Sequence, residues 1–323
     1  MAKTPDSEIQ ISEVACSDVD QLGEVYAGPH VRYLRSKTGP FSSQMKKVVL
    51  GELTFHTNHH ESPMLMEGVN PGDLVAIGFQ SLKSMPRLMM GEAFTNADVF
   101  LAGPRAEHLA TVLPGQHTFQ MFVPAKLLEA EIASRLNRVP FDFTTQRYLL
   151  RLGKHRVREL IDICALAFRT AHDLIGSVPS AEAVKQMQKT LVEQVVSVLT
   201  VEENDLFRGH PSFTSNGWIL LHAREYFEKH EGYPVRLAEV CQAVGVSQRA
   251  LQVAFAEGLG ISPMRYLKLR RLQAVRERLM RTSVDEMTVT LAAREAGFVD
   301  LSRFSRDYRN LFGHLPSETR RLK

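Results

Sequence analysis

The sequence has few cysteines, no long apolar run and no signal segment. Its three cysteines, Cys16, Cys164 and Cys241, lie far apart and without metal-ligand spacing, so we expect them to be reduced and buried in a cytoplasmic protein. No apolar run approaches the ~20 residues of a membrane span. The N-terminus also lacks the basic-then-apolar order of a secretion signal. These absences argue against a disulfide-stabilised fold, a secreted protein and a membrane partner.

Motifs of catalysis are missing as well. The chain contains no G-x-S-x-G elbow, no Walker loop and no G-x-G-x-x-G. Its histidines and acids mostly stand alone, without motif spacing. We therefore expect no enzyme and no cofactor.

The composition is that of a globular protein, with its positive charge concentrated at one end. The chain has 323 residues, of which 44% are hydrophobic and 23% charged, and this length suits two domains. Residues 212–323 hold 18 Lys plus Arg and 12 Asp plus Glu, whereas residues 1–211 hold 21 and 24. A basic C-terminal third on a mildly acidic body is typical of a polyanion-binding module.

The first part of the chain is rich in strand and turn signals. Apolar, β-branched segments at 46–57, 70–79, 97–103 and 117–124 are each bounded by turn residues. Short strands at spacings of roughly ten residues predict a sandwich or barrel, here over about 20–125, and not βαβ units.

Helical periodicity follows, with expected helices over 125–137, 155–175 and 180–203. The last begins at Ser180, a favoured capping residue, and pairs with its predecessor as a helical hairpin. Helical spacing places five of its apolar residues on one stripe: Val184, Met187, Leu191, Val195 and Val198. The stripe either covers the barrel or forms the interface of a homodimer. We expect a ligand-sensing and dimerisation domain over 1–203, a linker over 204–215 and a DNA-binding domain over 216–323.

One pattern occurs twice in the C-terminal third. Helical segments at 236–247 and 288–300 each contain a glycine, Gly245 or Gly297, followed by a capping residue, Ser247 or Asp300, and then a second helix. A short helix, a tight glycine turn and a second helix form a helix-turn-helix. A basic helix over 263–280 joins the two copies and spans roughly 27 Å at 1.5 Å per residue. That length could place two recognition helices about one DNA turn apart.

These segments resemble a known family. "LAEVCQAVGVSQRALQVAFAEGLGISPMRYLKLRRLQAVRERL" and "AAREAGFVDLSRFSRDYRNLFGHLP" look like the DNA-binding domain of AraC/XylS-type transcription regulators, over about a third of the chain. The resemblance implies an activator that binds double-stranded DNA, with a cupin-like N-terminal barrel, a small-molecule effector and RNA polymerase as further partners. The fold class expected is α+β: a cupin-like β-barrel with a helical hairpin, and an all-α domain of two helix-turn-helix units joined by a long helix.

Helical geometry selects the residues that face DNA. With Leu251 and Phe255 buried in one recognition helix, and Phe304 and Tyr308 in the other, the opposite faces are left for DNA. Arginine can bond guanine and glutamine can pair with adenine in the major groove, so Arg249, Gln252 and Arg306 are expected to contact bases. We expect Arg270, Arg271 and Arg303 to contact phosphate or solvent. The full set of DNA-binding candidates is Ser247, Gln248, Arg249, Gln252, Val253, Ser302, Arg303, Ser305, Arg306 and Arg309.

One cluster points to different chemistry. "HTNHHE" at 56–61 holds His56, His59 and His60 beside Glu61, and transition metals favour imidazole and carboxylate. A cupin-type metal enzyme carrying a DNA-binding tail is therefore the alternative function. However, adjacent strand residues face opposite ways, so His59 and His60 could not easily share one site. We expect a surface loop here and no metal. An architectural DNA binder is a third possibility, but it would not need some 200 residues of barrel and helices.

Overall fold

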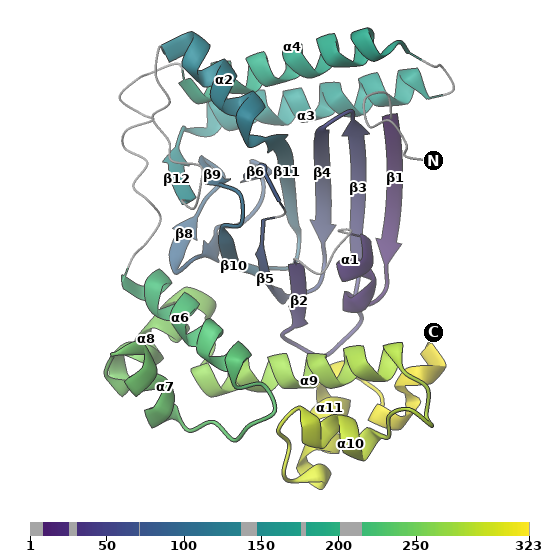
Figure 1. Ribbon diagram of the computed structural model, residues 1–323, viewed down its shortest axis with the longest axis vertical. Helices are drawn as coiled ribbons and strands as arrows, with labels where there is room; N and C mark the ends of the chain where they lie inside the picture. Colours follow the sequence, from purple (N-terminus) through teal and green to yellow (C-terminus); the bar gives the residue numbers. More distant parts are fainter. Residues whose placement is uncertain are drawn as a thin grey trace.

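The computed structural model describes residues 9–25, 31–70, 72–136, 147–175, 179–200 and 215–322. It combines a β-sheet domain, a layer of helices and an all-helical C-terminal domain (Figure 1). The α+β fold class is confirmed. The expected linker over 204–215 lies outside the described residues, apart from Ser215, which begins the first helix of the C-terminal domain.

The strands form two antiparallel sheets that are not joined into a closed barrel within the described ranges. The first sheet has the order β1-β3-β4-β11-β6-β9-β12 and the second β2-β5-β10-β7-β8. In the first sheet the strands are β1 Ile9–Cys16, β3 Ser43–Leu50, β4 Leu53–His60, β11 Gln116–Pro124, β6 Leu74–Gln80, β9 Asp98–Ala102 and β12 Arg147–Arg151. In the second they are β2 Val31–Arg35, β5 Met64–Val69, β10 Glu107–Val112, β7 Arg87–Met89 and β8 Glu92–Phe94.

The β domain extends beyond the predicted range of about 20–125. At one end, β1 pairs with β3 from Ile9 onward, and a short helix, α1 (Val19–Val25), leads to β2. At the other end, β12 pairs with β9 as far as Arg151. The run "RYLLR" has too few apolar residues to distinguish a strand from the start of a helix, so periodicity did not reveal β12.

Three helices cover the first sheet. They are α2 Ala125–Leu136, α3 Lys154–Leu174 and α4 Ala181–Thr200, close to the predicted bounds. The helix α3 contacts β1, β3, β4, β9 and β11, and α4 packs on α2 and α3. The Ser180 hydroxyl accepts a hydrogen bond from the Ala183 backbone N–H at 3.2 Å, as expected of the capping residue.

The apolar stripe of α4 is part of the core of this layer. Leu191, Val195 and Val198 are buried within one chain among residues of the first sheet, α2 and α3. Val184 is also fully buried and Met187 is half-buried. Of the two interpretations of the stripe, the structure therefore supports the intramolecular one. The assignment of these five residues to a dimer interface has less support, because the chain itself already removes most of the stripe from solvent.

The C-terminal domain consists of α6 Ser215–Lys229, α7 Leu237–Val244, α8 Gln248–Leu259, α9 Pro263–Arg281, α10 Val289–Glu295, α11 Leu301–Phe312 and the 3-10 helix η2 Pro316–Leu322. The pairs α7–α8 and α10–α11 are the two predicted helix-turn-helix units, and α9 is the helix that joins them. In Figure 1, α9 runs below β2 and α1, with α10 and α11 on its far side. None of the helices in the described ranges combines the length and apolar character needed to cross a membrane.

Candidate nucleic-acid interface

The first helix-turn-helix unit is formed by local interactions that the sequence encodes. Gly245 ends α7 with φ at 74°, in the left-handed region that favours glycine. The Ser247 hydroxyl then accepts a hydrogen bond from the Ala250 backbone N–H at 3.1 Å and starts α8. Leu251 and Phe255 are fully buried, so α8 can present only its opposite side outward.

The second unit repeats this arrangement, and its turn is one residue longer. Gly297 has φ at 84°, and the Asp300 carboxylate accepts a hydrogen bond from the Arg303 backbone N–H at 2.9 Å. Phe304 and Tyr308 of α11 are buried, and the Tyr308 hydroxyl is hydrogen-bonded to Thr319 Oγ1 at 2.7 Å. The two recognition helices, α8 and α11, are therefore capped and oriented by the same devices.

The predicted DNA-binding residues lie on the outward sides of these helices. In the first unit Ser247, Gln248, Arg249 and Gln252 are exposed and Val253 is half-buried; in the second Ser302, Arg303, Arg306 and Arg309 are exposed and Ser305 is half-buried. For Arg249, Arg303, Arg306 and Arg309, no ion pair is formed with any residue that the structure describes. Four arginines are thus available to bases or phosphates.

Two arginines of α9 have a different role from the one expected. Arg270 is 5% exposed, and its guanidinium lies 3.2 Å from Glu67 Oε1 on β5. The Tyr266 hydroxyl donates to the same carboxylate. Arg271 donates to the backbone carbonyls of Tyr233 and Gly297. The expectation that both contact phosphate or solvent is wrong. Charge and helical spacing could not reveal that Arg270 has a partner 203 residues away in the chain, or that Arg271 bonds to backbone carbonyls outside its own helix.

A second buried cation also ties α9 to the N-terminal domain. Arg276 is 1% exposed and lies 2.6 Å from both Asp18 and Asp20, at the start of α1. Its guanidinium also donates to His314 Nε2 at 2.7 Å and stacks over the Phe312 ring. Breaking a buried ion pair by removing one partner commonly costs about 3–5 kcal/mol. This cluster therefore holds α1, α9 and the end of the second unit together.

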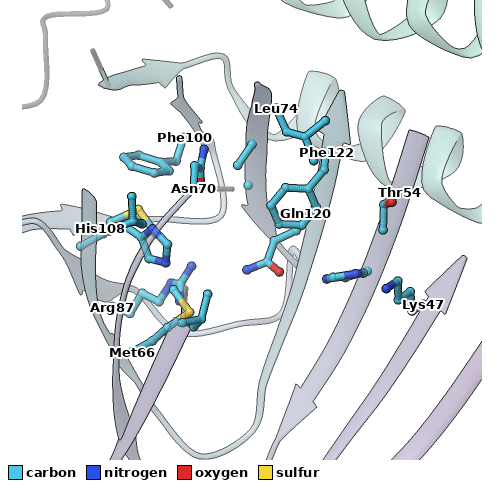
Figure 2. A pocket seen from close by; sticks show the side chains of 16 residues that line it. Lys47, Thr54, Met66, Asn70, Leu74, Arg87, Phe100, His108, Gln120 and Phe122 are labelled. Atoms are coloured by element: carbon cyan, nitrogen blue, oxygen red, sulfur yellow. The ribbon is translucent and has the colours of Figure 1, made fainter. Parts of the chain in front are cut away.

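A cavity of about 290 Å³ lies between the two sheets. Figure 2 shows His108, Arg87, Met66 and Phe100 grouped on one side, with Gln120 and Phe122 opposite and Lys47 and Thr54 beyond them. The lining residues are Val31, Lys47, Thr54, His56, Met66, Val69, Asn70, Leu74, Ala76, Gly78, Arg87, Met89, Phe100, His108, Gln120 and Phe122. They come from strands of both sheets.

Burial keeps the cavity histidines neutral at neutral pH. Burial, followed by the nearby Lys47 charge, lowers the pKa of His56 to about 3. Burial also lowers the pKa of His108 to about 4, helped by the charges of Arg224, Arg147 and Arg87. A neutral imidazole can serve as a hydrogen-bonding group in the cavity but adds no charge.

The histidine-rich segment belongs to β4, not to the expected surface loop. His56 and His60 point to the buried face, where His60 Nδ1 is hydrogen-bonded to Ser43 Oγ at 2.8 Å. His59 points the other way and lies 2.5 Å from Glu61. Within the described part of the chain, no group of three or more histidine, cysteine or acidic side chains is arranged to hold a metal ion. The alternation along β4 separates the histidines, as strand geometry requires.

Three strands of the second sheet connect the cavity with the C-terminal domain. On β5, Met66 lines the cavity and the next residue, Glu67, pairs with Arg270. On β10, His108 lines the cavity and its neighbour Glu107 pairs with Arg224 of α6. On β2, Val31 lines the cavity and its neighbour Arg32 lies 3.7 Å from Glu277 of α9. Successive residues of a strand face opposite sides, so a single layer of strand separates the two surfaces.

Comparison with known proteins finds relatives of the C-terminal helices. A helix-turn-helix domain family matches residues 240–322. The "Probable thc operon regulatory protein" of Rhodococcus erythropolis is 43% identical over 30% of this chain and 29% of its own length. The "XylDLEGF operon transcriptional activator 2" of Pseudomonas putida is 32% identical over 29% of this chain and 60% of its own. The solved AraC-like transcriptional activator CuxR shares 15% identity over 88% of this chain and 100% of its own, with a TM-score of 0.40.

The matched relatives are regulators, and the match to them is confined to part of each protein. The C-terminal third matches a helix-turn-helix domain family and relatives that include a XylDLEGF operon transcriptional activator, in agreement with the sequence resemblance. The chain spans about a third to three fifths of the length of the first curated relatives that it matches.

Proposed function

We propose that this protein is a sequence-specific, double-stranded DNA-binding transcription regulator that acts as an activator. The observation that carries the proposal is the pair of capped recognition helices, whose outward sides hold four arginines without an acidic partner among the described residues. Activation follows from relatives that are named as activators and makes RNA polymerase a further partner. A DNA partner supports the expected cytoplasmic location of the protein.

The competing functions have less support. A cupin-type metal enzyme with a DNA-binding tail would need a set of metal ligands, which the described residues do not provide. The relatives that this chain matches are regulators, not enzymes. An architectural DNA binder would leave the cavity and the buried contacts between domains without a role.

The test is binding selection with the full chain over randomised duplexes at two salt concentrations. We expect one enriched sequence with two clusters of preferred bases about 10 base pairs apart, because two recognition helices enter successive major grooves. Affinity should fall steeply with salt as phosphate contacts release counterions. Salt-dependent binding with no enriched sequence would support the architectural function instead. Absence of binding would refute both functions.

We extend the proposal to a small-molecule effector in the cavity between the sheets. The strand alternation on β2, β5 and β10 supports this, because a ligand that displaces Met66 or His108 also displaces the neighbouring Glu67 or Glu107. Those acids hold α9 and α6 of the DNA-binding domain. Occupancy of the cavity could thereby change how the two recognition helices are presented.

Self-association into a homodimer is a separate part of the proposal, and it needs a surface other than the stripe of α4. Leu191→Glu would place a charge in a position that is 5% exposed within one chain. We expect it to reduce stability by about 2–5 kcal/mol, and not to yield folded monomers. Light scattering and urea denaturation of this variant, with the exposed Lys189→Glu as control, separate the two outcomes. A folded, monomeric Leu191→Glu protein would return the stripe to the dimer interface.

A further inference from the structure

The turn of the second helix-turn-helix unit contains one residue that the first unit lacks. In the first unit the Val246 backbone N–H donates to the Cys241 carbonyl, five residues before it, at 3.0 Å. In the second unit the Phe298 backbone N–H donates in the same way to the Ala293 carbonyl, also at 3.0 Å. Both side chains are partly buried and pack against the core, so Phe298 takes the place of Val246. The cap of the recognition helix follows Val246 directly, whereas Val299 stands before the cap in the second unit and is the inserted residue.

The inserted valine contributes little to the packing of the chain. It is 87% exposed, the largest value among the large hydrophobic side chains that the structure describes. A side chain that stays in water gains little from folding, so neither the turn nor the core requires an apolar residue at this position. Single exposed hydrophobic residues are common on protein surfaces. What sets Val299 apart is its position beside a recognition helix.

Val299 lies at the end of α11 that faces DNA in a helix-turn-helix complex. The N-terminal residues of a recognition helix contact base edges in the major groove, and Val299 directly precedes Asp300, the cap of α11. Val299 and Arg303 both line a groove of about 490 Å³ between α9 and the start of α11. Arg303 is one of the exposed residues expected to contact DNA. The inserted valine is therefore on the same side of the second unit as the expected DNA contacts.

The chemistry of this position favours a base over a phosphate. The valine side chain has no charge and no hydrogen-bond donor with which to hold a phosphate. Its neighbour Asp300 is acidic, and like charges repel. In the major groove the apolar group that a base presents is the C5 methyl of thymine. Contact between this methyl and a valine removes apolar surface of both partners from water.

We propose that Val299 contacts the methyl group of a thymine at the edge of the base cluster that α11 contacts. This rests on the proposed function, because it needs a sequence-specific complex with DNA. It adds a specificity-determining residue that lies outside both recognition helices. Since the first unit has no inserted residue, this contact belongs to the second unit alone.

The experiment removes thymine methyl groups one at a time. The duplex is the sequence that the full chain enriches, and the cluster contacted by α11 is the one whose base preference relaxes in Arg306→Ala. Each thymine of that cluster is replaced singly by uracil, which keeps the hydrogen-bonding groups and lacks the methyl. We expect one of these replacements to weaken binding of the wild-type protein about fourfold, which corresponds to about 0.8 kcal/mol for one buried CH₂-sized group.

Variants of the inserted residue then identify the partner of that methyl. Val299→Ala should lose about the same affinity on the thymine duplex and should not distinguish uracil from thymine at that one position. Val299→Thr keeps one of the two methyl groups and should retain part of the discrimination. Val284→Ala is the matched control, because Val284 is 64% exposed and lies between α9 and α10. It should keep the affinity and the uracil effect of the wild type, and urea denaturation checks that all three variants fold.

The proposal is overturned if uracil has the same effect on the wild type and on Val299→Ala at every thymine of the cluster, or if the cluster contains no thymine. In the first case, a lower affinity of Val299→Ala for every duplex would assign the residue to a deoxyribose. Unchanged DNA affinity with reduced transcription by purified RNA polymerase would assign it to a protein partner.

The outcomes also separate this inference from the proposed function. A protein that selects two clusters of bases and is indifferent to Val299→Ala would remain a regulator, with this inference refuted. A protein that enriches no sequence would refute the proposed function and the thymine contact together.

Discussion

The two helix-turn-helix units have the same local design and different surroundings. In both, a left-handed glycine ends the first helix and a side-chain cap starts the second. The first unit packs onto the N-terminal domain, where Gly258 of α8 comes close to Gly91 in the turn between β7 and β8. The second unit packs on α9 and η2.

Their recognition helices also differ in charge. The helix α8 carries one cation, Arg249, and one acid, Glu257, together with Gln248 and Gln252. The helix α11 carries three arginines and one acid, Asp307, which is already paired with Lys268. Because phosphate contacts supply affinity and base contacts supply specificity, we expect the second unit to contribute more salt-dependent affinity and the first to depend more on neutral base contacts.

The largest difference between the two units should be the loss of stability when the turn glycine is replaced by alanine. A Cβ at Gly297 would lie 2.9 Å from Arg271 Cζ and 3.2 Å from the Gly232 backbone carbon, whereas a Cβ at Gly245 would meet nothing within 4 Å. Both positions have a positive φ, so alanine is strained at each. We expect Gly245→Ala to cost about 1–2 kcal/mol. Gly297→Ala should cost about 2–4 kcal/mol, since the contact adds to the strain.

Urea denaturation of the full-length variants measures this difference. Gly313→Ala is the matched control, because Gly313 also has a φ of 84° but open space around its Cβ position. It should resemble Gly245→Ala. Equal losses at Gly245 and Gly297 would show that Arg271 and the Gly232 backbone move aside easily, and that the two turns do not differ in packing.

We expect each helix-turn-helix unit to contact its own cluster of bases. Arg249→Ala should relax sequence preference at one cluster of bases, and Arg306→Ala at the other, each at a cost of about 1–3 kcal/mol if the arginine makes a bidentate contact with guanine. Binding selection over randomised duplexes gives the preference at each position. Lys229→Ala is the control, since Lys229 on α6 is paired with Glu225. A uniform loss at every position would instead assign that arginine to phosphate.

The smallest expected effect is a change in how strongly DNA affinity depends on salt concentration. Arg309 lies at the exposed side of α11, and a phosphate contact there predicts that Arg309→Ala lowers the slope of log affinity against log salt by about one. Gln252→Ala, on α8, should leave the slope unchanged because glutamine carries no charge. Fluorescence anisotropy over a series of salt concentrations gives both slopes. The same slope for wild type and Arg309→Ala would remove this residue from the phosphate contacts.

Prediction from sequence worked where the interactions are local. The helices α8 and α11, their caps Ser247 and Asp300, and the buried faces at Leu251 and Phe304 all depend on residues within a few positions of one another. Helical spacing and capping preferences encode such interactions directly. The same holds for Ser180 at the start of α4.

The sequence by itself determined a doubled helix-turn-helix domain behind a β-rich domain, because periodicity, glycine turns and caps are properties of short segments. Tertiary structure alone decided that Arg270 and Arg276 face acids of the N-terminal domain, that the α4 stripe is core, and that a cavity opens between two sheets. Each of these depends on groups brought together from distant parts of the chain. An arginine on a basic helix has the same sequence pattern whether it meets a phosphate or the carboxylate of Glu67, and only the packing of the two domains distinguishes the two partners.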